Sequence, residues 1–412
     1  MGRQWQLGAL WGIPFRLDPS WFVIVALVTL ANAVEINQRF LLTDHLSVWA
    51  WFWGFLMALA LFLSVLLHEL GHSLVARQQG ITVNSITLFI FGGVANLERE
   101  SKTPLGAFAV AMAGPCTSLV LSGLCYLWSQ AMTEAPLLAY ISQDLGRINL
   151  FLALFNLIPG LPLDGGQVLK ALVWHLTGDR LTGVQWAALS GQFLGALANI
   201  LGLVLLFSLG EAGGAWLALI GWFLWANARL SSRWTQLQRS LLSLTAAQAM
   251  SRQFKVVSGR LTLQEFVQSY LLDNPEQWLF PYYAAADGRY QGLVPLSQLS
   301  TLERSEWPRQ TVQDIAYPLA TIPSVTEKDS LATVINRLEA RRGATDDFGD
   351  RYLTVLSPAG AVAGVIDRGD IVQLLARQAP WPITAEEIQR IKAEGIYPEA
   401  LPLPTLARAL EG

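Results

Sequence analysis

Long apolar runs separated by short polar segments fill the first 230 residues of the chain. A helix needs about 20 apolar residues to cross a bilayer. Runs near that length occur at residues 20–36, 48–76, 104–130, 146–160, 183–209 and 213–230. The fourth run is short and ends at Pro159 and Pro162, which stop a helix. The pattern predicts a polytopic α-helical membrane domain of about six spans.

Residues 81–98, ITVNSITLFIFGGVANLE, interrupt this helical pattern. β-branched and aromatic residues alternate partly with polar ones, and a glycine pair, Gly92 and Gly93, follows the most apolar stretch. This composition is typical of two strands joined by a turn. We therefore expect a small β-hairpin between the second and third spans.

The pattern changes near Thr245, where charged residues become frequent. The first 245 residues hold 12 Lys and Arg and 11 Asp and Glu, whereas the remaining 167 hold 16 and 20. Two passages of this second part share the order helix, strand, glycine-bearing turn, strand and helix, with a period of about 65 residues. The sequence predicts a membrane domain over residues 1–240, a pair of α/β modules over 245–300 and 311–378, and a polar extension over 379–412.

Charge restricts the partners and the orientation of the chain. A net charge of -3 gives no basic footprint, so no nucleic-acid partner is expected. Of the 12 Lys and Arg in the first 245 residues, all but Arg39 and Arg147 fall on one side of the predicted spans. Cytoplasmic loops carry such an excess, so both termini are expected in the cytoplasm. The ANA at residues 31–33 is similar to a signal-peptidase site, but we do not expect cleavage there.

The stretch LLHELGHSLVA, residues 66–76, places three ionisable groups at the end of the second apolar run. Such a group at the bilayer centre costs at least about 2.5 kcal/mol, so its default interpretation is functional. His68 and His72 leave the same face of a helix and can share one metal ion. Glu69 lies beside them, within reach of a water on that ion. Two imidazoles, a water and a carboxylate meet the needs of zinc-dependent hydrolysis.

A catalytic zinc needs a third protein ligand. Val75 and Gln78 stand where a metzincin carries glycine and histidine, which excludes that class. Glu98 and Glu100 are candidates, but they lie in a polar ERESK stretch that is typical of a solvated loop. Asp164 is the better candidate.

Asp164 lies in NLIPGLPLDGGQV, residues 156–168. Pro159 and Pro162 end the fourth span early, and Gly165 and Gly166 permit tight backbone turns beside an ion. Non-helical backbone at membrane depth is tolerated where it is buried in protein or lines a cavity. The alternative is an ordinary turn-forming aspartate.

Other interpretations of the histidine pair remain open. A chance match, a haem site or a structural metal site would also place two histidines on one helix face, but none explains the glutamate beside His68. A metal ion transporter would also use metal-binding groups in the membrane. Transporters show corresponding broken spans in two related halves, whereas this sequence shows one broken span and no second half.

The motifs together resemble the site-2 proteases, zinc metalloproteases that cut within membrane-spanning helices. The resemblance is carried by HELGH at residues 68–72, NLIPGLPLDGG at 156–166, FGG at 91–93 and AGPCTS at 113–118. It covers nearly the whole membrane domain. It implies that His68, His72 and Asp164 bind one Zn²⁺ per chain, that Glu69 is the general base, and that Asn156 is a polar support in the active site.

The predicted hairpin gains a role under this resemblance. A peptide bond in a helix is shielded, so a protease must unwind its substrate first. An exposed strand edge could hold the unwound segment by adding it to the sheet, with Phe91, Gly92 and Gly93 as substrate-binding residues. The alternative is a surface hairpin that only packs on the membrane domain. For the GPCTS segment, tight helix packing by small residues is the preferred interpretation.

The paired modules over residues 245–378 resemble CBS domains, which pair around a groove that often binds adenine nucleotides. The pattern is only partly met. The first module has Ser297 at the strand-end hydroxyl position but no aspartate after it, and the second keeps Asp370 but has Asp367 at the hydroxyl position. The resemblance implies nucleotide binding at Asp370 and homodimerisation through these modules. The partly met pattern counts against the nucleotide, and a purely structural dimerising module is the alternative.

The sequence therefore predicts an intramembrane zinc endopeptidase that cuts membrane-anchored substrates near the cytoplasmic side, with CBS domains as a regulatory part. The expected location is the inner (plasma) membrane of a cell. A CBS-regulated metal ion transporter is the alternative. The sequence does not name the substrate or its cleavage site.

Overall fold

The computed structural model describes residues 5–41, 46–89, 92–132, 134–272, 280–340, 351–378, 383–398 and 401–411. The chain divides into two compact units, Met1–Thr235 and Gln236–Gly412. The division falls inside one long helix, a few residues before the domain end predicted at residue 240. The predicted domain boundaries themselves stay a prediction, and the two units are described separately.

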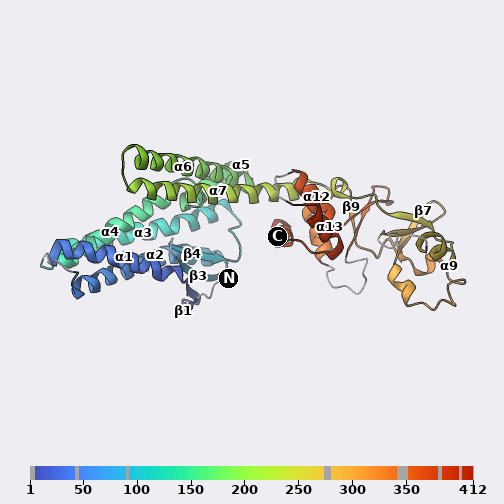
Figure 1. The fold of residues 1–412 in the computed structure, drawn as a ribbon, viewed down its shortest axis with the longest axis horizontal. Coiled ribbons are helices and arrows are strands. Elements are labelled where there is room, and N and C mark those ends of the chain that lie inside the picture. The colour runs from blue at the N-terminus through green and yellow to red at the C-terminus, as the bar shows by residue number, and fades with distance from the viewer. Residues whose placement is uncertain are drawn as a thin grey trace. The chain divides into compact units, whose positions relative to one another are not determined.

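Seven α-helices lie among the described residues of the N-terminal unit (Figure 1). They are α1 (Ser20–Ile36), α2 (Val48–Gln78), α3 (Pro104–Ala131), α4 (Pro136–Asn156), α5 (Asp164–Thr177), α6 (Arg180–Ser208) and α7 (Gly213–Ser243), which continues into the second unit. Helix α3 packs against α2, α4 and α5, while α1 packs on α2 and α5 on α6. The central position of α3 becomes important at the site.

Four helices among the described residues are long and apolar enough to cross a membrane: Ser20–Phe40, Val48–Gln78, Pro104–Ala131 and Arg180–Ser208. The runs predicted at 146–160 and 213–230 lie largely in α4 and α7. Helix α4 begins ten residues earlier than the apolar run, and this added part includes the polar Gln143 and Asp144. It ends at Asn156, before Pro159. Six spans stay a prediction.

A four-stranded sheet packs on the half of α2 that carries the histidines. Its order is β1 (Trp5–Leu10), β2 (Ile13–Leu17), β3 (Val83–Phe89) and β4 (Gly92–Leu97). Strands β3 and β4 pair antiparallel within residues 81–98, and β2 joins β3 in parallel. A small core of Ile13, Phe15, Leu70, Val83 and Ile86 ties the sheet to α2.

Sequence reasoning missed the first hairpin. Ile13, Phe15 and Leu17 are buried while Pro14 and Arg16 are less so, which is the alternation of a half-buried strand. Trp11 and Gly12 both have positive φ, as a two-residue hairpin turn of type I′ requires. Five alternating residues beside a Trp-Gly pair were the available signal.

The described residues of the C-terminal unit form two sheets that share the arrangement of their first three strands. Strands β5 (Lys255–Ser258), β6 (Tyr282–Ala286), β7 (Arg289–Val294) and β8 (Tyr317–Pro318) form one, and β9 (Ser324–Thr326), β10 (Leu353–Leu356) and β11 (Val362–Ile366) form the other. In each sheet the first two strands pair in parallel and the next pair is antiparallel, with a register shift in that antiparallel pair. The expected duplication is therefore visible in the strand pairing.

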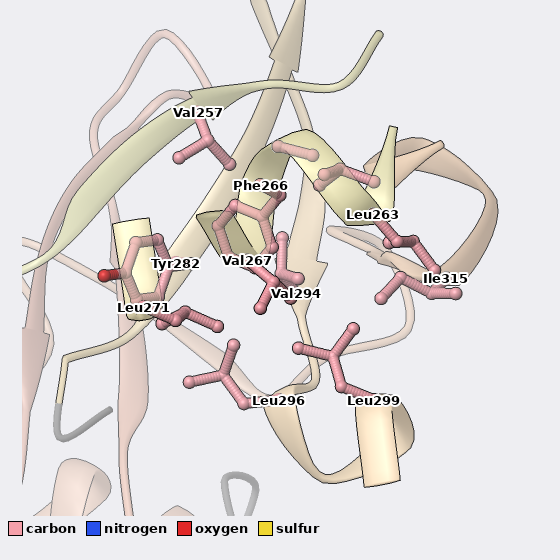
Figure 2. Close-up of a cluster of buried hydrophobic side chains, with 12 residues drawn as sticks. Val257, Leu263, Phe266, Val267, Leu271, Tyr282, Val294, Leu296, Leu299 and Ile315 are labelled. Carbon is pink, nitrogen blue, oxygen red and sulfur yellow. The ribbon is translucent and has the colours of Figure 1, made fainter. Parts of the chain in front are cut away.

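Short helices complete the first module: α9 (Leu263–Phe266), the π-helix Val267–Leu271 and the 3₁₀-helix Leu296–Ser300. Apolar side chains from these helices and from β5, β6 and β7 meet in one buried cluster (Figure 2). Phe266 and Tyr282 lie edge to face at its centre, with ring centroids 5.2 Å apart. This geometry is the preferred one for aromatic pairs.

The entry segment of each module belongs to the other module. Helix α8 (Ala246–Ala249) contacts β9, β11 and α12 (Arg368–Gln378), and Ser251 pairs with Val365 of β11. Conversely, α10 (Val312–Ile315) contacts β6 and β7, and β8 pairs with β7. The two modules are thus interlocked rather than consecutive.

The C-terminal extension is folded on the second module. Helix α13 (Ala385–Glu394) packs on α12, and α14 (Leu403–Glu411) packs on α11 (Leu331–Glu339). Leu401, Leu403 and Ala407 are buried. Beneath this cover Arg368 and Glu339 form an ion pair at 2.9 Å with almost no solvent exposure.

Candidate metal centre

Helix α2 brings His68 and His72 to one face. They are one turn apart, and their side chains point into the unit, with only 3% and 9% of each residue exposed. The two Nε2 atoms lie 3.3 Å apart. Two ring nitrogens this close without an intervening proton or cation would repel each other, so the pair is arranged for a shared positive ion.

The chain returns to these rings at the break between α4 and α5. Helix α4 ends at Asn156, residues 157–163 are not helical, and α5 begins at Asp164. Oδ2 of Asp164 lies 3.1 Å from Nε2 of His68 and 3.3 Å from Nε2 of His72. The sequence-predicted trio is therefore brought together.

Gly165 and Gly166 serve close packing rather than a turn. Both lie in the first turn of α5, and neither has a positive φ. An added Cβ would lie 2.3 Å from the carbonyl oxygen of Leu157 at Gly165, and 2.4 Å from the carbonyl carbon of Gly160 at Gly166. Only glycine lets α5 approach the preceding loop closely enough to place Asp164.

The three atoms fit a zinc ion. Zinc–ligand bonds of 2.0–2.2 Å in a tetrahedron separate the ligand atoms by roughly 3.3–3.6 Å. The observed separations of 3.1, 3.3 and 3.3 Å are close to that range. Room for the rings comes from Gly114 of α3, where an added Cβ would lie 2.1 Å from Nε2 of His72 and 2.6 Å from Nε2 of His68. The donor set and the space both suit zinc.

Glu69 lies outside the three-ligand cluster, on the side of the sheet. Gly93 of β4 packs directly on it, since a Cβ added there would lie 2.5 Å from Cγ of Glu69. Glu69 is partly exposed. A carboxylate beside the cluster and next to an edge strand is positioned to accept a proton there.

Helix α3 supplies partners for both histidine rings. Nδ1 of His72 donates to the carbonyl oxygen of Val110 at 2.6 Å, and Nδ1 of His68 lies 2.9 Å from Oγ of Ser118. Sequence reasoning preferred helix packing by small residues for the GPCTS segment. The structure adds hydrogen bonding to that interpretation. No local signal distinguished Ser118, because small residues one turn apart are common wherever helices pack.

The alternative ligands Glu98 and Glu100 are placed differently. Oε2 of Glu100 lies 2.6 Å from Nζ of Lys170 and 2.9 Å from a guanidinium nitrogen of Arg180. Partial desolvation would raise the pKa of this half-exposed carboxyl, but the two cations outweigh that effect and lower the pKa of Glu100 below its usual range. Glu100 is a structural ion-pair partner, and neither glutamate belongs to the described metal-ligand cluster.

The remaining predicted residues differ in how they are placed. Gly92 and Gly93 begin β4, and Phe91 lies outside the described residues. Asn156 is the last residue of α4 and is partly buried. Its supporting role stays a prediction. A second asparagine, Asn149, lies seven residues earlier in α4, is fully buried and donates a hydrogen bond to the hydroxyl of Ser64 in α2.

Asp370 has partners within its own unit. Its Oδ1 accepts from Nζ of Lys392 in α13 at 2.6 Å, and its Oδ2 accepts from the backbone N–H of Asp367. Lys392 of the polar extension thus contacts the carboxylate to which nucleotide binding was assigned. A ligand at Asp370 would have to compete with Lys392.

Comparison with known proteins finds a matching family model, curated relatives and solved structures. The family model described as Peptidase family M50 matches residues 56–146 and 130–198. A putative zinc metalloprotease of Synechocystis sp. is 39% identical over 92% of this chain and 97% of its own length. A site-2 protease structure from Methanocaldococcus jannaschii is 30% identical and covers 56% of this chain and 96% of that chain, with a TM-score of 0.39. A structure of the CBS domain of a bacterial Mg²⁺ transporter in complex with ATP is 15% identical and covers 36% of this chain and 97% of that chain, with a TM-score of 0.28.

Proposed function

The chain belongs to peptidase family M50, the site-2 protease family of zinc metalloproteases, and we propose that it is an intramembrane endopeptidase that cuts membrane-spanning segments of protein substrates. The observation that carries this proposal is the convergence of His68, His72 and Asp164 next to Glu69, on helices of a membrane protein.

His68, His72 and Asp164 would hold the zinc ion through Nε2, Nε2 and Oδ2. When bound, zinc supplies a Lewis acid that activates water and polarises a carbonyl group. Glu69 accepts the proton of the attacking water and delivers it to the leaving amide nitrogen.

The edge of β4 would hold the unwound substrate. Strand β4 pairs only with β3, so its other edge has no strand partner among the described residues. Gly93 of that strand lies against Glu69. A substrate added along this edge by main-chain hydrogen bonds would pass beside the general base. Phe91 and Gly92 are assigned to the same role.

Cleavage near the cytoplasmic side follows from the distribution of cations. Arg99 donates to the carbonyl of Gly80, just beyond the C-terminal end of α2. Lys170 and Arg180 meet Glu100 in the segment after β4. These cations gather beyond the histidine end of α2, and positive side chains mark the cytoplasmic face. We infer that both termini are cytoplasmic and that the protein resides in an inner (plasma) membrane.

The C-terminal unit enters this proposal as a regulatory or dimerising module. Its two interlocked α/β modules could transmit ligand binding to the protease. The contact of Lys392 with Asp370 requires any nucleotide at that carboxylate to displace an ammonium group.

The test compares wild type, Glu69→Gln and Glu98→Gln in proteoliposomes that contain a transmembrane reporter. Zinc content is measured by mass spectrometry, and cleavage by gel mobility. We expect one zinc per chain in all three proteins and cleavage by wild type and Glu98→Gln only. Equal cleavage by Glu69→Gln would remove Glu69 from its role. Zinc uptake into vesicles that requires His68 but is indifferent to Glu69→Gln would favour the transporter.

A further inference from the structure

We propose that Ser118 of α3 is a positioning residue of the metal centre, whose hydroxyl oxygen accepts a hydrogen bond from Nδ1–H of His68 and so directs Nε2 of that ring toward the metal. This inference rests on the proposed function, because it takes His68, His72 and Asp164 as the metal ligands.

Both histidine rings are tied to the same face of α3. His72 reaches the carbonyl of Val110 at 2.6 Å, and His68 reaches Oγ of Ser118 at 2.9 Å. Val110, Gly114 and Ser118 are four residues apart, so they form one stripe along α3. Along this stripe, the carbonyl of Val110 is one hydrogen-bond acceptor and the hydroxyl of Ser118 is the second. Gly114 lies between them and leaves space for the two Nε2 atoms. The acceptors are eight residues apart and the histidines four, so the two rings diverge from α2 toward opposite ends of this stripe, and their Nε2 atoms meet over Gly114.

The carbonyl of Val110 fixes the chemistry of the first contact. A carbonyl oxygen only accepts, so Nδ1 of His72 must carry the proton and Nε2 presents its lone pair. The same tautomer is required of His68 if its Nε2 is a ligand. A serine hydroxyl can serve as the acceptor. Ring nitrogens opposite a metal regularly donate to such a partner, which fixes ring orientation and tautomer.

The position of Ser118 argues against a purely local role. Serine and threonine in helices commonly bond the backbone of their own preceding turn. Thr117 does so, since its hydroxyl donates to Ala113. Ser118 instead lies against a side chain 50 residues earlier in the chain, and its own exposed fraction is 0%. The hydroxyl of Ser118 therefore contacts His68 of the neighbouring helix α2.

Ser122 provides a matched control. It lies one turn further along α3, and its hydroxyl donates to the carbonyl of Gly146 in α4 at 2.8 Å. Ser122→Ala removes a cross-helix hydrogen bond from the same helix without touching either histidine. The pair separates an effect on the metal centre from an effect on helix packing.

The experiment measures zinc affinity of the purified full-length protein in detergent by competition with a chromophoric chelator. Loss of a partner of this kind weakens metal binding by about 10–100-fold. We expect Ser118→Ala to raise the Kd for zinc by that factor, and Ser122→Ala to leave it within about twofold. In the cobalt-substituted protein, the visible absorption bands should shift in Ser118→Ala only.

Two further variants isolate the hydroxyl from the volume of the side chain. Ser118→Thr and Ser118→Val have nearly the same shape, but only the former keeps an acceptor. We expect near-wild-type affinity for Ser118→Thr and the loss seen in Ser118→Ala for Ser118→Val. The difference between Ser118→Thr and Ser118→Val tests the role of the hydroxyl even where Ser118→Ala does not fold.

Equal zinc affinities for Ser118→Thr and Ser118→Val, or equal losses in Ser118→Ala and Ser122→Ala, would overturn the inference. A wild-type protein that binds zinc while Ser118→Ala binds it equally well would remove only the positioning role. A wild-type protein that binds no zinc would instead remove the metal centre itself, and with it the proposed function.

Discussion

Gly114 of α3 faces the two histidine rings without a side chain, and this gap is what allows both Nε2 atoms to approach Asp164. An alanine Cβ there would lie 2.1 Å from Nε2 of His72. We expect Gly114→Ala to displace one or both rings and to weaken zinc binding by at least about 100-fold, beyond the effect of losing a single supporting hydrogen bond. Zinc affinity by chelator competition is the measurement.

Gly123 of the same helix is the control for this prediction. An added Cβ at Gly123 meets nothing within 4 Å. Gly123→Ala should therefore leave zinc binding unchanged and, in a helix interior, stabilise the fold by up to about 1 kcal/mol. Zinc binding by Gly114→Ala at wild-type affinity would show that the rings do not occupy the space beside α3.

At the scale of residues, the groups that could be identified from the sequence alone are those whose chemistry is unusual for a membrane span. His68, His72 and Asp164 stood out because ionisable groups are costly in an apolar run. Gly114 and Ser118 did not stand out, because small residues are common wherever helices pack. Their relation to the histidines depends on how α3 is placed against α2, and no local pattern encodes that placement.

At the scale of elements, α5 is tied to the segment after β4 by one buried cation. Nζ of Lys170 lies 2.6 Å from Oε2 of Glu100 and 3.4 Å from Oε1 of Gln167. The side chain of Lys170 is 5% exposed, whereas that of Glu100 is 55% exposed. The two halves of this pair should therefore respond differently to removal.

We expect Glu100→Gln to destabilise the protein more than Lys170→Met. Glu100→Gln leaves a buried ammonium group without its countercharge, which should cost about 2–3 kcal/mol, less than for a fully buried pair. Lys170→Met removes the charge and keeps the volume, and Glu100 retains Arg180 and water, so the cost should stay below about 1 kcal/mol. Unfolding in mixed detergent measures both values.

The double variant makes this prediction specific. Glu100→Gln with Lys170→Met should be about as stable as Lys170→Met alone, because no buried charge then lacks a partner. Glu98→Gln, a change in the same segment, serves as the control and should have little effect. Additive losses in the double variant would contradict a direct coupling between the two side chains.

The elements also show where apolar patterning stops being informative. It located α1, α2, α3 and α6 within a few residues, because these helices present apolar side chains on all faces. It placed the start of α4 ten residues late, because the polar Gln143 and Asp144 separate the first turns of that helix from the apolar run. The β1–β2 hairpin is stabilised by pairing with β3, a strand about 70 residues away in the sequence, and such non-local support is invisible in a short window.

At the scale of the whole molecule, the duplication in the second part was readable but the exchange of entry segments was not. Thr245 bridges to Ser330, and Thr311 bridges to Thr262, so the two halves repeat the same cross-connection. The extension after residue 379, which sequence reasoning left without a role, contributes Lys392 to a buried cluster with Asp367 and Asp370. Two carboxylates share one ammonium group there.

This cluster makes the stability of the C-terminal unit depend on pH. Burial, followed by repulsion from Asp370, raises the pKa of Asp367 from 3.8 to about 6. Below about pH 4 Asp367 is protonated in both folded and unfolded chains. Between about pH 4 and 6 the folded chain binds more protons, so stability falls as pH rises, and above pH 6 the contribution is lost. At 1.36 kcal/mol per pKa unit, the loss is on the order of 3 kcal/mol.

Asp367→Asn should remove this pH dependence. The amide keeps an oxygen to accept from the backbone N–H of Asp370, a bond of 2.7 Å, and it ends the repulsion between the two carboxylates. We expect a gain of about 1–2 kcal/mol at pH 7 and little difference at pH 4. Urea unfolding of the full-length protein between pH 4 and 8, followed by pulse proteolysis of the C-terminal unit, measures this difference in stability.

Asp314→Asn is the control with the opposite pH dependence. Hydrogen bonds from Thr311 lower the pKa of Asp314, so the loss of its carboxylate should reduce stability most above pH 4. Equal pH profiles for wild type and Asp367→Asn would show that Lys392 already neutralises the pair.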